Sequence, residues 1–232
     1  MRRFYKQVTI GANEGGGFSV LLDGKPVKTP ARSALTMPTA TLAEAVAGEW
    51  ANQGEEIDPA IMPMTSYATT AIDRVASQRE NVIKEIAGYA GSDLLCHRAD
   101  EPDELVDRQN TIWQPLLDWC EAELGASLEV SVGIMPLRQS EAALAAVHKA
   151  VAKFADPPLA GLHALTSGCG SVVIALAITS GRMTAEEGFA ASQVDETWQT
   201  ERWGEDEEAA DKRARLRREV LAAAKFVKLC TD

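Results

Sequence analysis

The period of the hydrophobic pattern changes once along this chain, and no other sequence feature constrains the fold as much. Phe18, Val20 and Leu22 recur at every second position, which predicts a β-strand with one buried face. Beyond two prolines near residue 60, apolar residues recur instead at the spacing of amphipathic helices. We therefore predict an α+β protein, with an N-terminal β-rich domain over residues 1–63 and a larger, mainly α-helical domain over residues 64–232.

The N-terminal domain is expected to contain a hairpin and one helix. Asp23 and Gly24 suit a two-residue hairpin turn, because glycine tolerates the positive φ that such turns require. Thr41 and Glu44 have the spacing of a capping box, which predicts that the helix begins there. Trp50 falls on the apolar side of this helix, so we assign it a structural role against the sheet.

The second domain is predicted to be built from consecutive helices. Trp113, Pro115 and Trp119 are assigned structural roles, and Pro115 is expected to kink or restart the helix that carries the two tryptophans. Gly204 is expected to be a left-handed cap that ends one helix before the last one begins. The expected helices span residues 103–124, 140–154, 158–168, 171–180, 185–202 and 206–228.

The charge balance limits the classes of partner. Acidic residues outnumber basic ones by 34 to 23, giving a formal net charge of −11, which disfavours nucleic acid and anionic membranes as partners. The longest apolar run, residues 172–178, is far shorter than the roughly 20 residues of a membrane-spanning helix, so membrane insertion is not expected. The N-terminus shows neither a secretion signal nor a presequence. These features predict a protein that works in the cytoplasm, where it is made.

No motif predicts a catalytic residue, a metal site or a cofactor. The glycines at 15–17 precede a strand and lack the lysine of a phosphate loop, and the three histidines lack metal-ligand spacing. The four cysteines form no C-x-x-C pair and are expected to be small buried hydrophobes. One enzymatic alternative stays open: a hydrolase that uses Cys169, or Asp195 together with Glu196.

The stretch from Ser192 to Asp211 has an unusual composition, with eight carboxylates, two tryptophans and one basic residue. Acids after residue 205 suit the first turn of the last helix, but Asp195 and Glu196 are expected late in the helix 185–202, where the dipole disfavours them. Charge beside large aromatic rings is typical of a protein-docking surface, although core packing of the tryptophans is the leading alternative. The predicted partner-binding residues are Asp195, Glu196, Trp198, Gln199, Trp203 and Glu205.

Short motifs that span nearly the whole chain resemble a known family. They are Arg3-Phe4-Tyr5-Lys6, Gly16-Gly17-Phe18, Lys28-Thr29-Pro30, Glu49-Trp50, Asp93-Leu94-Leu95-Cys96, Trp113 with Pro115-Leu116-Leu117-Asp118-Trp119, Asp195-Glu196, Trp198-Gln199 and Trp203-Gly204-Glu205-Asp206. In their order and spacing the chain is similar to the assembly chaperones that escort the α subunit of F-type ATP synthase in mitochondria and related bacteria. Gln114 and His97 depart from that family's pattern, so no role is carried over to them.

The resemblance implies a chaperone without catalytic activity. Such a protein binds the newly made α subunit and shields its β-facing surface until assembly, in the bacterial cytoplasm or, in eukaryotic relatives, the mitochondrial matrix. The family's functional carboxylates correspond best to Asp195 and Glu196, with Glu196 the stronger candidate. A general holdase with many clients is the other alternative.

Overall fold

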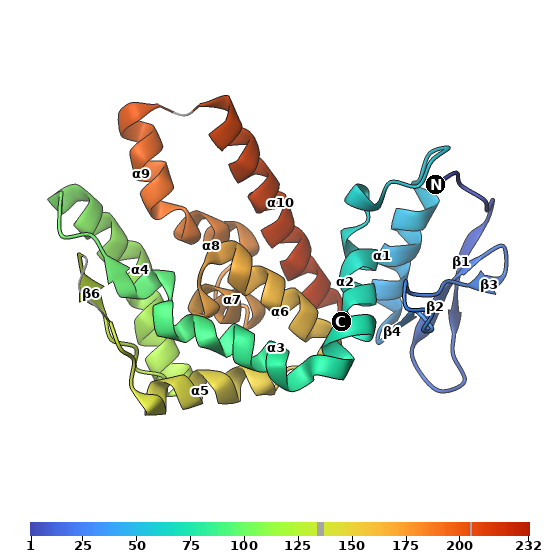
Figure 1. Ribbon diagram of the computed structural model, residues 1–232, viewed down its shortest axis with the longest axis horizontal. Helices are drawn as coiled ribbons and strands as arrows, with labels where there is room; N and C mark the ends of the chain where they lie inside the picture. The colour runs from blue at the N-terminus through green and yellow to red at the C-terminus, as the bar shows by residue number, and fades with distance from the viewer. Residues whose placement is uncertain (134–136, 205) are drawn as a thin grey trace. The chain divides into compact units, whose positions relative to one another are not determined.

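The computed structural model describes residues 1–133, 137–204 and 206–232 (Figure 1). Contacts between Cα atoms divide the chain into two compact units. Unit 1 comprises Met1–Arg79, Ala155–Gly161 and Ala222–Asp232, and unit 2 comprises Glu80–Phe154 and Leu162–Leu221. A compact unit does not have to fold independently as a domain does. The predicted domain boundary between residues 63 and 64 therefore stays a prediction.

Unit 1 contains a small antiparallel sheet that begins with the predicted hairpin. Its strands are β1 (Val8–Ala12), β2 (Phe18–Leu22), β3 (Lys25–Pro26) and β4 (Thr36–Met37), with β2 paired to each of the other three. Asp23 and Gly24 join β2 to β3 with φ angles of 48° and 79°, as a two-residue hairpin requires. The backbone amides of Gln7 and Lys6 donate to the Asp23 carboxylate and lower its pKa. The hairpin prediction is confirmed.

The helix α1 (Ala40–Ala51) packs against β1 and β2 (Figure 1). Its N-cap is Thr39 rather than the predicted Thr41, because Thr39 has an extended backbone and its hydroxyl accepts a hydrogen bond from the Leu42 amide. Trp50 is half-buried, with its ring 5.7 Å from the Tyr5 ring, and the Tyr5 hydroxyl donates to the Trp50 carbonyl at 2.6 Å. These contacts agree with a structural role for Trp50, which stays a prediction.

The remaining elements of unit 1 are helical. They are η1 (Pro59–Ile61), α2 (Pro63–Thr70), the π-helical turn η2 (Ala71–Val75), the start of α3 (Ala76–Gly88), and parts of α6 (Asp156–Cys169) and α10 (Glu207–Leu229). The Glu49 carboxylate accepts hydrogen bonds from the Met64 and Thr65 amides, so α1 caps the first turn of α2.

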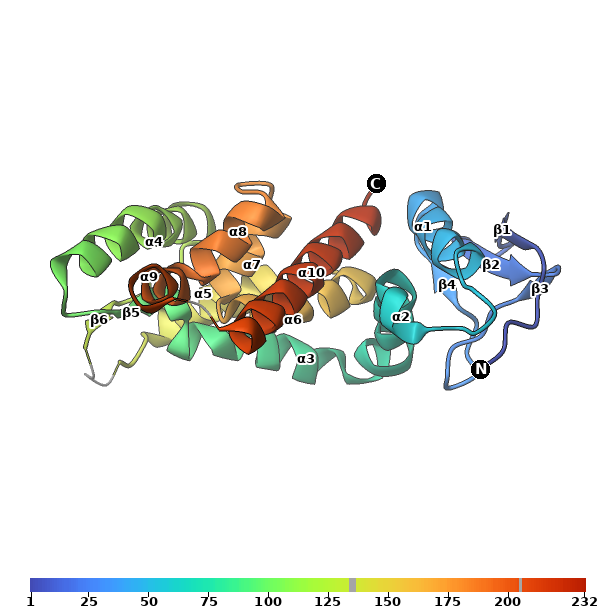
Figure 2. The same ribbon diagram turned by 90° about the horizontal axis from the view of Figure 1, so that it is seen from above.

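The core of unit 2 is built around α7 (Val172–Thr179), whose residues 172–178 are all buried. It contacts α4 (Asp103–Leu124) and α8 (Ala185–Ser192) (Figure 2). Unit 2 also contains η3 (Tyr89–Ser92), η4 (Leu94–Cys96), β5 (His97–Arg98), β6 (Ser131–Val132), α5 (Glu141–Ala152) and α9 (Val194–Trp203). The order of a small β region followed by a mostly helical part confirms the predicted α+β class. In the described ranges, no helix combines the length and hydropathy that a membrane crossing needs.

Two predictions about helix ends need correction. Of the kink or restart expected at Pro115, the restart is wrong, because α4 runs through Pro115 as one helix. Pro115 has no N–H to donate to the Thr111 carbonyl. Both residues are exposed, so water can donate to that carbonyl instead. Gly204 caps α9 with the expected positive φ of 83°, but its ψ of 168° is not that of a left-handed helix.

Gly161 in α6 is packed so closely within unit 1 that a larger side chain there should destabilise the fold. A Cβ added there would lie 2.5 Å from Val227 Cγ2 and 3.1 Å from the Ala223 carbonyl oxygen. We expect Gly161→Ala to lower the free energy of unfolding by about 1–3 kcal/mol through overpacking. Gly48→Ala is the matched control, because nothing lies within 4 Å of its added Cβ, and it should stabilise α1 by up to about 1 kcal/mol. Denaturant unfolding measures both, and equal effects would contradict the packing explanation.

Candidate partner-binding surface

Asp195 and Glu196 lie in the first turn of α9, not late in a longer helix as the sequence predicted. The predicted helix 185–202 is interrupted at Gln193, whose φ of −115° and ψ of 24° are not helical. In a continuous helix the Ala191 carbonyl would accept from the Asp195 amide. It accepts instead from the indole Nε1 of Trp113 at 2.7 Å. The buried indole from α4 therefore stabilises the break between α8 and α9.

This break changes the interpretation of the two acids. Carboxylates in the first turn of a helix are favoured by the helix dipole, so Asp195 and Glu196 are no longer an electrostatic anomaly. Their assignment to a partner-binding surface must rest on where their side chains point.

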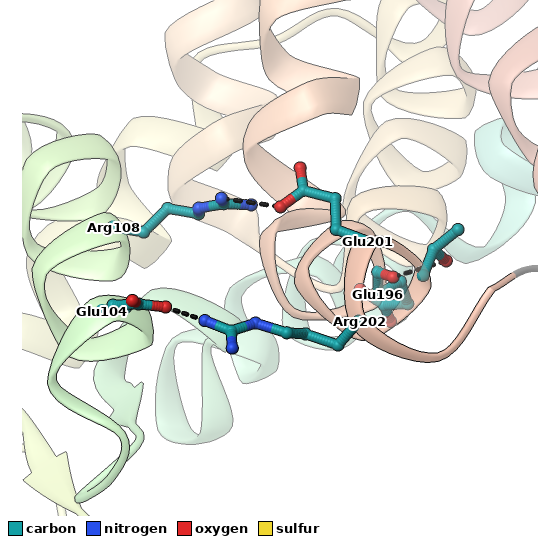
Figure 3. A network of polar contacts seen from close by, with 6 residues as sticks. Glu104, Arg108, Glu196, Glu201 and Arg202 are labelled. Atoms are coloured by element: carbon teal, nitrogen blue, oxygen red, sulfur yellow. Dashed lines mark hydrogen bonds and ion pairs between the residues drawn. The ribbon is translucent and has the colours of Figure 1, made fainter.

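One side of α9 faces α4 and forms polar contacts with it, two of which are drawn in Figure 3. Gln109 Nε2 donates to Asp195 Oδ1 at 2.7 Å. Arg108 Nη2 pairs with Glu201 Oε2 at 2.8 Å, a hydrogen bond that raises the pKa of Arg108 and lowers that of Glu201. Arg202 forms an ion pair with Glu104. Asp195 is therefore bound within the protein.

The two tryptophans of α9 contact each other, and they differ in exposure. Trp198 is half-buried, with the Arg202 guanidinium 5.0 Å from its ring centroid. Trp203 is 74% exposed and meets the Trp198 ring edge to face at 5.5 Å. Trp198 thus packs within this corner, whereas most of the Trp203 ring faces solvent.

The outward side of α9 carries Glu196, Gln199 and Trp203, all exposed and spaced as one helical face. Among the described residues, no group forms a hydrogen bond or ion pair with the Glu196 carboxylate, and only its backbone carbonyl accepts, from Thr200 Oγ1 at 2.8 Å. Figure 3 shows Glu196 apart from the two ion pairs with α4. Of the six predicted partner-binding residues, these three share an open face, Asp195 and Trp198 pack inward, and Glu205 lies outside the described residues.

The geometry at the candidate residues disfavours the hydrolase alternative. Cys169 is 2% exposed, and burial above all raises the pKa of its thiol to about 12, so the thiolate nucleophile is not formed at neutral pH. All four cysteines are buried, as predicted. Asp195 is held by Gln109, and the groove of about 420 Å³ between α8, α9 and α10 has no histidine or cysteine among its described lining residues.

Sequence reasoning missed the residues of α4 that hold α9, above all Gln109. A signal for Gln109 was present: it continues the buried stripe of α4 that contains Trp113, Leu117 and Cys120. A polar residue on an apolar stripe needs buried hydrogen-bond partners, so its position indicated a specific polar contact. The identity of that partner was not readable from the sequence.

A helical unit that presents an open acidic and aromatic face has the features of a protein-binding protein. A family model described as ATP12 chaperone protein matches residues 2–121. The chain belongs to this family of chaperones of ATP synthase assembly, which confirms the resemblance seen in its motifs.

Two solved structures and one curated relative match this chain over nearly its full length. The chain is 40% identical to Atp12 from Paracoccus denitrificans, whose crystal structure matches with a TM-score of 0.94 over 99% of this chain and 98% of that one. An aspartate-to-lysine mutant of the same protein matches with the same TM-score and identity, over 99% of this chain and 97% of that one. The protein atp12, mitochondrial, of Schizosaccharomyces pombe is 24% identical over 243 residues, covering 100% of this chain and 83% of the relative.

Proposed function

We propose that this chain is a chaperone, without catalytic activity or cofactor, that binds the newly made α subunit of F-type ATP synthase. It shields the β-facing surface of α until assembly, in the bacterial cytoplasm. The observation that carries the proposal is the open face of α9, where the Glu196 carboxylate, which has no partner among the described residues, lies on the same side as Gln199 and the 74% exposed Trp203. The family and the motif resemblance support the choice of client.

The chemistry of this face suits a protein client. Trp203 offers a large, rigid ring that can be buried on binding at little cost in conformational entropy. Glu196 is an exposed acidic side chain, so it fits a basic group on α and fixes the orientation of docking. The contact needs no bond-making step.

Binding of this kind also explains how assembly could proceed without energy input. An α subunit without its neighbours exposes apolar surface that associates incorrectly, and a bound chaperone lowers the concentration of that species. The β subunit can then displace the chaperone if the α–β contact is the more stable one.

The direct test uses the purified chain with purified α, with β, and with unrelated aggregation-prone proteins. We expect it to bind α and suppress its aggregation, to leave β unbound, and to release α when β is added. Equal protection of unrelated proteins would favour a general holdase instead. Failure to bind α would show the proposal to be wrong.

A further inference from the structure

We propose that Asp195 is a positioning residue rather than a partner contact: together with Gln109 it fixes the first turn of α9 and thereby sets the direction of Glu196. This inference rests on the proposed function of the α9 face. It assigns different roles to two adjacent carboxylates that the sequence presents as a pair.

The side chain of Gln109 connects three segments of unit 2. It is 1% exposed, and its two polar atoms are both committed. Oε1 accepts from the Ala99 amide at 2.8 Å, and Nε2 donates to Asp195 Oδ1 at 2.7 Å. Because an unsatisfied buried amide is costly, this side chain cannot turn without losing one bond or the other. Asp195 is therefore tied through α4 to the segment that follows β5.

A second contact holds the other side of the α8–α9 break. Trp113 lies four residues after Gln109 on α4, is fully buried, and donates to the carbonyl of Ala191. The two anchors thus bind the chain just before and just after Gln193. Within α9 itself only Val194 is buried, and the ion pairs at Glu201 and Arg202 are exposed and screened by solvent. The orientation of α9 consequently depends on the contacts at its first turn.

The helix geometry then separates the two acids. Consecutive residues of an α-helix point about 100° apart. With Asp195 directed at Gln109, Glu196 is turned away from α4, in agreement with its exposure and its lack of a side-chain partner among the described residues. Asp195 contributes a hydrogen-bond acceptor at a fixed place, whereas Glu196 contributes a free charge.

Three substitutions distinguish these roles by affinity for purified α subunit. Asp195→Asn removes the charge but keeps the oxygen that accepts from Gln109, so its affinity should stay within about twofold of the wild type. Asp195→Ala removes the acceptor and should weaken binding about tenfold or more. Glu196→Gln, the matched neutralisation one residue away, should lose as much as Asp195→Ala and reduce the salt dependence of binding.

The free protein gives a second readout that does not depend on the client. Hydrogen exchange of the α9 amides should rise in Asp195→Ala and stay near the wild-type rate in Asp195→Asn and Glu196→Gln. A double variant tests whether reversing the hydrogen bond restores the order of α9. Gln109→Glu keeps the acceptor for the Ala99 amide but places a carboxylate against Asp195, which repels it. Adding Asp195→Asn supplies an amide donor to the new carboxylate at position 109. The double variant should recover slow exchange.

The outcomes separate this inference from the function on which it rests. If Asp195→Asn loses affinity as much as Glu196→Gln, with unchanged exchange in α9, Asp195 is a charge contact and the positioning role is overturned. Unchanged exchange in Asp195→Ala overturns it as well. If the wild type does not bind α at all, the proposed function fails, while the exchange measurements still decide whether Asp195 orders α9.

Discussion

Reversing the charge of Glu196 should abolish binding of the α subunit and leave the fold intact. The Glu196→Lys side chain would place a cation where we propose that a basic group of α docks, so attraction becomes repulsion. Glu196 is exposed and its carboxylate has no partner among the described residues, so little stability should be lost. We expect a drop in affinity of at least about 100-fold, measured by titration calorimetry with purified α, with thermal melting unchanged.

The control for this variant is Glu80→Lys, which makes the same charge change on the exposed surface of α3. It should bind α as the wild type does, showing that local charge and not net charge matters. Full activity of Glu196→Lys, or equal losses in both variants, would remove Glu196 from the binding surface.

The largest stability effect is expected at Asp93, a fully buried carboxylate that caps the central helix of unit 2. It accepts hydrogen bonds from the amides of Val172 and Val173 in the first turn of α7, and from the Leu95 amide. Asp93→Leu would leave these buried donors without an acceptor. We expect it to lower the free energy of unfolding by more than about 3 kcal/mol, measured by denaturant unfolding. A loss below about 1 kcal/mol would contradict this role.

The same carboxyl should make stability depend on pH in an identifiable direction. Burial raises the pKa of Asp93 from 3.8 to about 6, against the lowering effect of its hydrogen bonds. Between these two values the folded state binds more protons than the unfolded state, so this group's contribution to stability falls as the pH rises from about 4 to about 6. The difference in unfolding free energy between wild type and Asp93→Asn should therefore decrease over that window.

Local patterns in the sequence were sufficient for several elements. The alternation in β2 and the Asp23-Gly24 turn predicted the hairpin, because strand faces and turn angles depend on residues close in sequence. The burial of the four cysteines followed from their apolar character. The client came from motif resemblance, since no physical property of the chain names it.

Helix ends were predicted less well, since competing contacts from elsewhere decide them. The capping box at Thr41 fits the local pattern, yet Thr39 is the cap, and its hydroxyl also donates to the Leu229 carbonyl 190 residues away. Pro115 suggested a kink or a restart of α4, and the restart is absent because the carbonyl of the exposed Thr111 can bind water instead.

In the acidic stretch, the sequence and the tertiary structure determined different properties. By itself, the sequence determined that charge and tryptophan gather in residues 195–203, and that these residues are helical. Only the tertiary structure decided which side chains are free, because the contacts that orient α9 come from distant residues. Trp113 reaches Ala191 across 78 residues and Gln109 reaches Asp195 across 86, and together they turn Asp195 inward and leave Glu196 in solvent.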